Sequence, residues 1–186
     1  MKLEVWRDGK TENLQTPLKP ADMFSMYEVL YEPPPRYVLY GGLVFQPLTA
    51  NLMAVLAGGA DLRLKQKYTM FATDQIYREI PEPVILSAVL PDSSNVYLRG
   101  LAGQIVSEIN GKKIRTLTDV EPALAANGER TVIRFGGDAR PAVLKRDEVN
   151  RATPQIMNQY GISEVSRTGL GDRRLAKGPA RQKETK

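Results

Sequence analysis

Apolar and polar residues alternate with the two-residue period of a β-strand at positions 104–109. Asn110-Gly111 follows directly and is a strong hairpin signal, because both positions of a two-residue turn favour positive φ. Ile114 resumes the strand after the turn. These positions predict a strand, a tight turn and a second short strand. Further strands are predicted by the apolar or alternating runs at 38–46, 83–90, 130–135 and 141–145.

Helical spacing is found between these strands. Residues 48–56 place Leu48, Leu52, Val55 and Leu56 on one face of a predicted helix. The charged stretch 61–79 is also compatible with a helix that packs one face on the strands.

Two further helices are predicted from their termini. Thr118 and Glu121 have the spacing of a capping box, and Asn127-Gly128 marks the end of that helix. Asp147 begins a helix that runs through Ala152. Pro154 is expected to break it or to open a second helix ending near Tyr160.

The N-terminal and C-terminal parts differ from this pattern. Residues 1–18 alternate around Asp8-Gly9, which predicts a β-hairpin. Residues 19–36 form a connector with near-helical spacing in its middle and three prolines near its end. We interpret Pro33-Pro34-Pro35 as a stiff spacer, with a partner-binding ligand as the alternative. Residues after 167 are rich in Gly, Arg, Lys and Pro and are expected to be disordered.

Two motifs carry a resemblance to a known family. The order of strand, Asn-Gly turn, short strand and capped helix at 98–128 resembles a PDZ domain of the bacterial protease type. The run Tyr-Val-Leu-Tyr-Gly-Gly-Leu-Val-Phe-Gln-Pro-Leu at 37–48 resembles the start of the last PDZ domain of HtrA/Deg-type serine proteases. The resemblance covers roughly residues 7–166.

The resemblance implies an α+β, mainly β fold: a PDZ-like, partly open β-barrel capped by helices. The PDZ-like domain would span 37–166, with a helical insertion at 61–79. The hairpin 1–18 would be the last strands of a preceding PDZ domain or strands that the visible domain borrows. The connector would be 19–36 and the basic tail 167–186.

A peptide-binding site is also implied by the resemblance. PDZ domains bind an extended peptide as an added strand and capture its terminal carboxylate in a Gly-rich turn. Val44 stands where the usual loop has a second glycine, so Gly41-Gly42 could instead only bend a strand. The facing wall would be the helix 119–127, part of whose apolar face must pack on the core. The candidate binding residues are Gly41, Gly42, Leu43, Val44, Phe45, Val120, Ala123 and Leu124.

Composition limits the chemistry that this chain can perform. It has no histidine and no cysteine, which removes the general base of a Ser-His-Asp triad, thiol nucleophiles and the usual zinc ligands. We therefore expect no catalytic residues, no metal and no cofactor in this chain, and no enzymatic activity. By resemblance, the parent polypeptide would be a serine endopeptidase whose catalytic domain lies outside the chain.

The net charge of +5 comes from the tail. Seven of 26 basic residues and two of 21 acidic residues follow residue 166, so the body carries 19 of each. Basic pI therefore does not predict that the folded part binds nucleic acid. No apolar run is long enough to span a membrane and no signal peptide is expected.

These observations favour a non-catalytic peptide-binding, regulatory or assembly module. Its partners would be a peptide or protein segment, another copy, or a preceding PDZ or protease domain. The alternative is a small basic protein whose tail contacts nucleic acid or an anionic surface. The sequence leaves the ligand, the oligomeric state and the compartment open, although the resemblance favours the periplasm or cell envelope.

Overall fold

Two four-stranded antiparallel sheets form the body of the protein. The structure is a computed structural model that describes residues 2–15, 34–57, 62–74, 79–126, 128–137 and 139–169. The first sheet has the order β10-β3-β4-β5 and the second β7-β6-β8-β9. Their strands are β3 (Tyr37–Tyr40), β4 (Leu43–Pro47), β5 (Val84–Val89), β6 (Val106–Ile109), β7 (Lys112–Lys113), β8 (Arg130–Phe135), β9 (Ala142–Lys145) and β10 (Ser166–Arg167).

The two sheets meet at an isolated bridge between Ile85 and Ile105. No closed barrel forms among the described strands, because each sheet keeps two edges. This arrangement confirms the predicted α+β, partly open architecture. It also confirms the Asn110-Gly111 hairpin, which joins β6 to β7.

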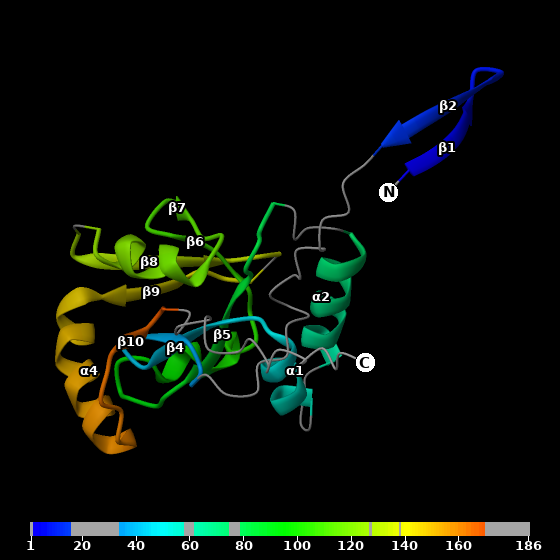
Figure 1. The fold of residues 1–186 in the computed structure, drawn as a ribbon. Coiled ribbons are helices and arrows are strands. Elements are labelled where there is room, and N and C mark those ends of the chain that lie inside the picture. Colours follow the sequence, from blue (N-terminus) through cyan, green and yellow to red (C-terminus); the bar gives the residue numbers. More distant parts are fainter. Residues whose placement is uncertain are drawn as a thin grey trace, which may run out of the picture.

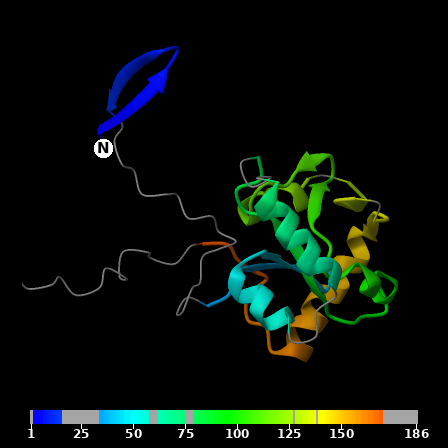
Figure 2. The ribbon, with the colours of Figure 1, turned by 90° about the vertical axis from the view of Figure 1, so that its right-hand side faces the viewer.

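Helices cover the sides of the two sheets. Figure 1 shows α4 (Arg146–Tyr160) along one side, and α1 (Ala50–Ala57) and α2 (Leu62–Thr73) on the opposite side. In Figure 2 these two helices lie on the face that is turned toward the viewer. The shorter helical elements are η2 (Val96–Leu101), η3 (Leu117–Asp119) and α3 (Val120–Leu124).

The core divides into two apolar clusters. The larger one joins both sheets, α3 and α4, and the smaller one consists of Leu48, Met53, Ile85 and Ile105. Tyr68 and Phe71 of α2 are half-buried against the smaller cluster, so the helix in the charged stretch 61–79 packs one face on the domain as predicted. The face of α1 differs from the prediction, since Met53 is buried whereas Val55 is exposed.

The N-terminal hairpin consists of β1 (Lys2–Arg7) and β2 (Lys10–Gln15), as predicted. Its register runs from Lys2 opposite Gln15 to Arg7 opposite Lys10. It forms a two-stranded sheet of its own and is drawn away from the body in Figures 1 and 2. Its strands are therefore not part of either sheet of the visible domain.

Three local predictions are wrong. Residues 38–46 form not one bent strand but the hairpin β3–β4. The capping interaction lies two residues earlier than predicted, because the Asp119 carboxylate accepts the Thr116 N–H at 2.8 Å. Pro154 lies inside the continuous helix α4, which ends at Gly161 with φ of +65°. Burial of Val149, Ala152 and Ile156 on one face of α4 outweighs the local cost of the proline.

Some predictions fall outside the described residues. These are the short helix in the connector and the disorder expected beyond residue 169. Within the described ranges, no helix is both long enough and apolar enough to cross a bilayer.

Candidate functional site

Five of the predicted site residues lie at the β3–β4 hairpin. Gly41 and Gly42 have φ of +55° and +83° and form its two-residue turn. Leu43 and Phe45 point into the core and are fully buried, while Val44 is half-buried. The structure thus brings these five residues together. Because the two glycines have no side chain and Leu43 and Phe45 face the core, a ligand would meet mainly their backbone groups.

Strand β4 has no free edge. It pairs with β3 on one side, with Val38 opposite Phe45, and with β5 on the other, with Leu43 opposite Val89. A peptide could pair with β4 only if β3 or β5 moved away, because a strand is added at a free edge.

The Gly41 N–H and the carbonyls of Gly41 and Gly42 are hydrogen-bonded within the domain. The Gly41 N–H donates to Thr153 Oγ1 at 3.3 Å. The buried side chain of Asn95 donates to the carbonyls of Gly41 and Leu90, both at 2.8 Å. The Leu90 N–H donates to Gly42 O. Capture of a carboxylate by this turn stays a prediction, and it would require the Gly41 N–H to leave Thr153.

The other three predicted residues lie on α3. Val120, Ala123 and Leu124 are 0–5% exposed and belong to the larger core cluster together with Val38. Their side chains therefore stabilise the domain rather than face solvent. The exposed residue of this helix that reaches the first sheet is Glu121, whose carboxylate accepts the Ser166 hydroxyl.

Sequence reasoning missed the strand beside β3. β10 pairs antiparallel with β3, with Ser166 opposite Val38 and Arg167 opposite Tyr37. The Leu39 N–H donates to Val165 O at 2.7 Å. A two-residue strand shows no periodicity, so no sequence pattern marks it.

A charged clamp holds the end of this strand. Arg36 Nε donates to Thr168 O at 2.9 Å, and the guanidinium pairs with the carboxylate of Glu82. Glu82 Oε2 also accepts the Leu117 N–H at 2.9 Å. Both side chains of the ion pair are largely buried, and four segments distant in sequence, around residues 36, 82, 117 and 168, meet at this one charge pair.

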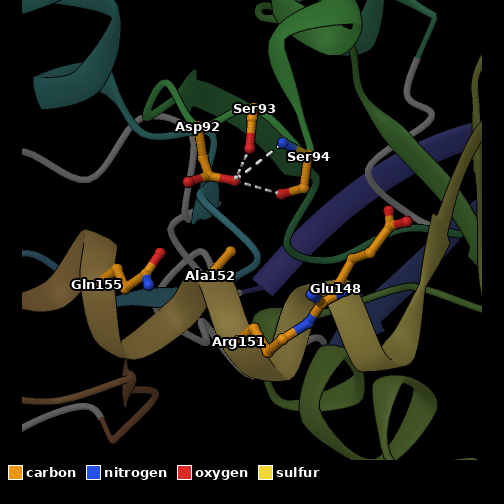
Figure 3. Close-up of a pocket in the computed structure, with 7 residues that line it drawn as sticks. All are labelled: Asp92, Ser93, Ser94, Glu148, Arg151, Ala152 and Gln155. Atoms are coloured by element: carbon orange, nitrogen blue, oxygen red, sulfur yellow. Dashed lines mark hydrogen bonds between the residues drawn. The ribbon is translucent and has the colours of Figure 1, made fainter.

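A cleft of about 340 Å³ lies elsewhere, between the loop after β5 and helix α4 (Figure 3). Asp92, Ser93 and Ser94 line one wall. The Asp92 carboxylate accepts the Ser94 N–H at 2.9 Å and the Ser94 hydroxyl at 2.7 Å. These bonds from Ser94 lower the pKa of Asp92 below its usual value. Because the Asp92 carboxylate accepts hydrogen bonds from its own loop, its role is to stabilise that loop. The opposite wall is formed by Glu148, Arg151, Ala152 and Gln155.

The sequence of this chain is similar to that of known proteins. The PDZ domain family model matches residues 27–167. Protease Do-like 2, chloroplastic, of Arabidopsis thaliana is 28% identical over 163 residues, which cover 85% of this chain and 26% of that protein. Putative protease Do-like 12, mitochondrial, of the same plant is 24% identical over 164 residues, which cover 88% of this chain and 29% of that protein. The chain thus spans little more than a quarter of each of these relatives.

Proposed function

The chain belongs to the PDZ domain family, and on this premise we propose that it is a non-catalytic module of an HtrA/Deg-like serine protease. Its task is to bind an extended peptide or protein segment, either from a substrate or from another subunit or domain of the protease. Proteolysis then belongs to a domain outside these residues.

The observation that supports peptide binding is the pairing of β10 with β3 beside α3. Residues 166–168, distant in sequence from β3, are held there by strand pairing and by two side-chain hydrogen bonds. Arg36 donates to the Thr168 carbonyl, and the Ser166 hydroxyl donates to Glu121. Main-chain hydrogen bonds of this kind supply affinity in strand addition, and the flanking side chains supply selectivity. The fold therefore contains, within the chain, an example of the strand pairing that peptide binding would use.

The test is the binding of a fluorescent peptide library to the full chain, with free and amidated C-termini, at low and high salt. We expect saturable binding by a subset of peptides that changes little with salt. A steep loss of all binding at high salt would instead assign it to the basic residues after 166. The absence of any peptide preference in either salt would contradict the proposal.

A second measurement addresses assembly. The mass of the chain in solution is determined at several concentrations by sedimentation or light scattering. A mass that rises with concentration, and falls when a bound library peptide is added, would assign the site to contact between subunits. A constant monomer mass would restrict the function to peptide or domain binding.

A further inference from the structure

We infer that the strand-addition site is the edge of β3 and that residues 164–168 are its built-in occupant, which an external peptide must displace. This deepens the proposed function and rests on it for the identity of the external ligand. β4 is paired on both sides, so a strand can pair with the β3–β4 hairpin, without opening it, only along the outer edge of β3, the position that β10 holds.

The occupant is held by polar contacts along its whole length. Tyr37 Oη donates to Glu164 O at 2.8 Å, Leu39 N to Val165 O at 2.7 Å and Arg36 Nε to Thr168 O at 2.9 Å. Residues 164, 165 and 168 are thus bound through their own backbone carbonyls, which any extended peptide offers. Two contacts require particular side chains, the Ser166 hydroxyl on Glu121 and the Arg167 guanidinium over the Tyr37 ring.

Few apolar side chains fix the occupant. Val165 is 48% exposed, and Ser166, Arg167 and Thr168 are half-buried. Val38 and Leu39 of the neighbouring strand are instead 3–4% exposed. If another strand took the place of β10, each lost hydrogen bond would be replaced by a new one. The net free-energy change of the exchange would then be small for each bond, and the apolar core would stay closed.

Residues 164–168 are covalently tethered to the site, which favours them over a free peptide. A tethered segment acts at an effective concentration on the order of millimolar, so a free peptide of equal intrinsic affinity competes poorly. The ligand class that fits is an extended segment with a hydroxyl or another donor facing Glu121, and it need not end in a free carboxylate. Release of residues 164–168 is the step that opens the site.

The test weakens the occupant's backbone pairing and leaves the rest of the chain intact. Hydrogen-bonded and non-hydrogen-bonded pairs alternate in an antiparallel ladder. The bond from Leu39 N to Val165 O therefore makes Arg167–Tyr37 the next hydrogen-bonded pair. Arg167→Pro removes that ladder donor, whereas the matched control Arg167→Ala keeps it and removes only the side-chain contacts with Glu164 and Tyr37.

The probe is a labelled octapeptide with the sequence of residues 162–169, and its scrambled version is the control. We expect Arg167→Pro to bind it at least about tenfold tighter than the parent chain, and Arg167→Ala to bind it less than about threefold tighter. A folded Arg167→Pro variant without this gain would overturn the inference. Loss of folding in Arg167→Pro would also overturn it, because β10 would then be an integral strand.

Amide hydrogen exchange gives an independent readout on the unmodified chain. The Leu39 N–H should exchange faster than the Leu86 N–H, whose acceptor is Gln104 O within the body. In Arg167→Pro the octapeptide should slow exchange at Leu39. Equal protection of both amides in the parent chain would show that β10 opens only with global unfolding, contrary to the inference.

The outcomes also separate this inference from the proposed function. If the octapeptide binds Arg167→Pro while the peptide library binds neither chain, residues 164–168 are a displaceable occupant but no external ligand exists. If library peptides bind the parent chain and leave Leu39 exchange unchanged, the module binds peptides at another site.

Discussion

Two hairpins of this protein have the same turn geometry and opposite surroundings. β1–β2 turns at Asp8-Gly9 with φ of +52° and +77°, and β3–β4 turns at Gly41-Gly42 with +55° and +83°. The first has almost entirely exposed side chains, including Trp6 at 75%, whereas the second contributes Leu43 and Phe45 to the core. Turn chemistry therefore specifies a hairpin, but only packing decides how much it contributes to stability.

The turns also differ in their tolerance of a side chain. A Cβ atom on Gly9 would meet nothing within 4 Å. A Cβ atom on Gly42 would lie 2.2 Å from Asn95 Nδ2 and 2.5 Å from Leu90 O. The second turn thus needs glycine for space as well as for its positive φ.

The largest contrast is expected from removing one aromatic side chain from each hairpin. Phe45→Ala should lower the free energy of unfolding by about 3–5 kcal/mol, because it leaves a cavity in the larger cluster. Trp6→Ala should change it by less than about 0.5 kcal/mol. Urea denaturation of both variants measures the difference. An equal loss in both would mean that the first hairpin is packed in solution.

Substitution of the turn glycines should give the next largest effect. Gly42→Ala should destabilise the chain by roughly 2–4 kcal/mol, from backbone strain and overlap with Asn95. Gly9→Ala should leave the Tm of the body unchanged. Calorimetry of the two variants tests this, and a Gly42→Ala Tm within about 2 °C of the parent would contradict the geometry.

A smaller effect is expected at the side chain that supports the second turn. Asn95→Ala removes the donors to Gly41 O and Leu90 O and the acceptor of the Asp92 N–H, and should cost about 2–3 kcal/mol. The matched control Asn13→Ala lies on exposed strand β2 and should have little effect. Chemical denaturation of both variants provides the measurement. Equal stabilities would show that water replaces the Asn95 contacts.

The smallest effect concerns pH and the loop that carries Asn95. The pKa of Asp92 is lowered in the folded chain, so its contribution to stability is present above the unfolded value near 3.9. The contribution is lost as pH falls from about 4 through the folded pKa. Asp92→Asn should therefore show a shallower fall in Tm between pH 6 and pH 3 than the parent chain. Parallel curves for the two proteins would exclude this role of Asp92.

The same comparison explains which parts of the fold could be predicted. Asp8-Gly9 and Asn110-Gly111 are flanked by alternating or polar residues, and both turns were predicted correctly. Gly41-Gly42 lies between two runs that are apolar at almost every position, so the stretch resembles one buried strand. Fully buried strands lose the alternation that separates one strand from the next.

The candidate site shows the same limit. The sequence suggested Val120, Ala123 and Leu124 as a groove wall, and helical spacing does place them on one face. Which way that face points depends on the sheet beneath it, and the structure turns it into the core. Glu121 and Arg36 face the occupied strand edge, yet neither has a local pattern that distinguishes it from other surface charges.

The α+β class, most strands, the helix within residues 61–79 and the absence of a histidine- or cysteine-based catalytic centre in this chain could be predicted from the sequence alone. Those features follow from local periodicity, turn propensity and composition, which act between residues close in the chain. Three further features became visible in the folded chain alone: β4 is paired on both edges, Asn95 supports the Gly41-Gly42 turn, and β10 covers β3. Each of these joins segments separated by large distances in sequence. Such contacts are selected by burial and hydrogen-bond satisfaction in the assembled core, for which local sequence carries no signal.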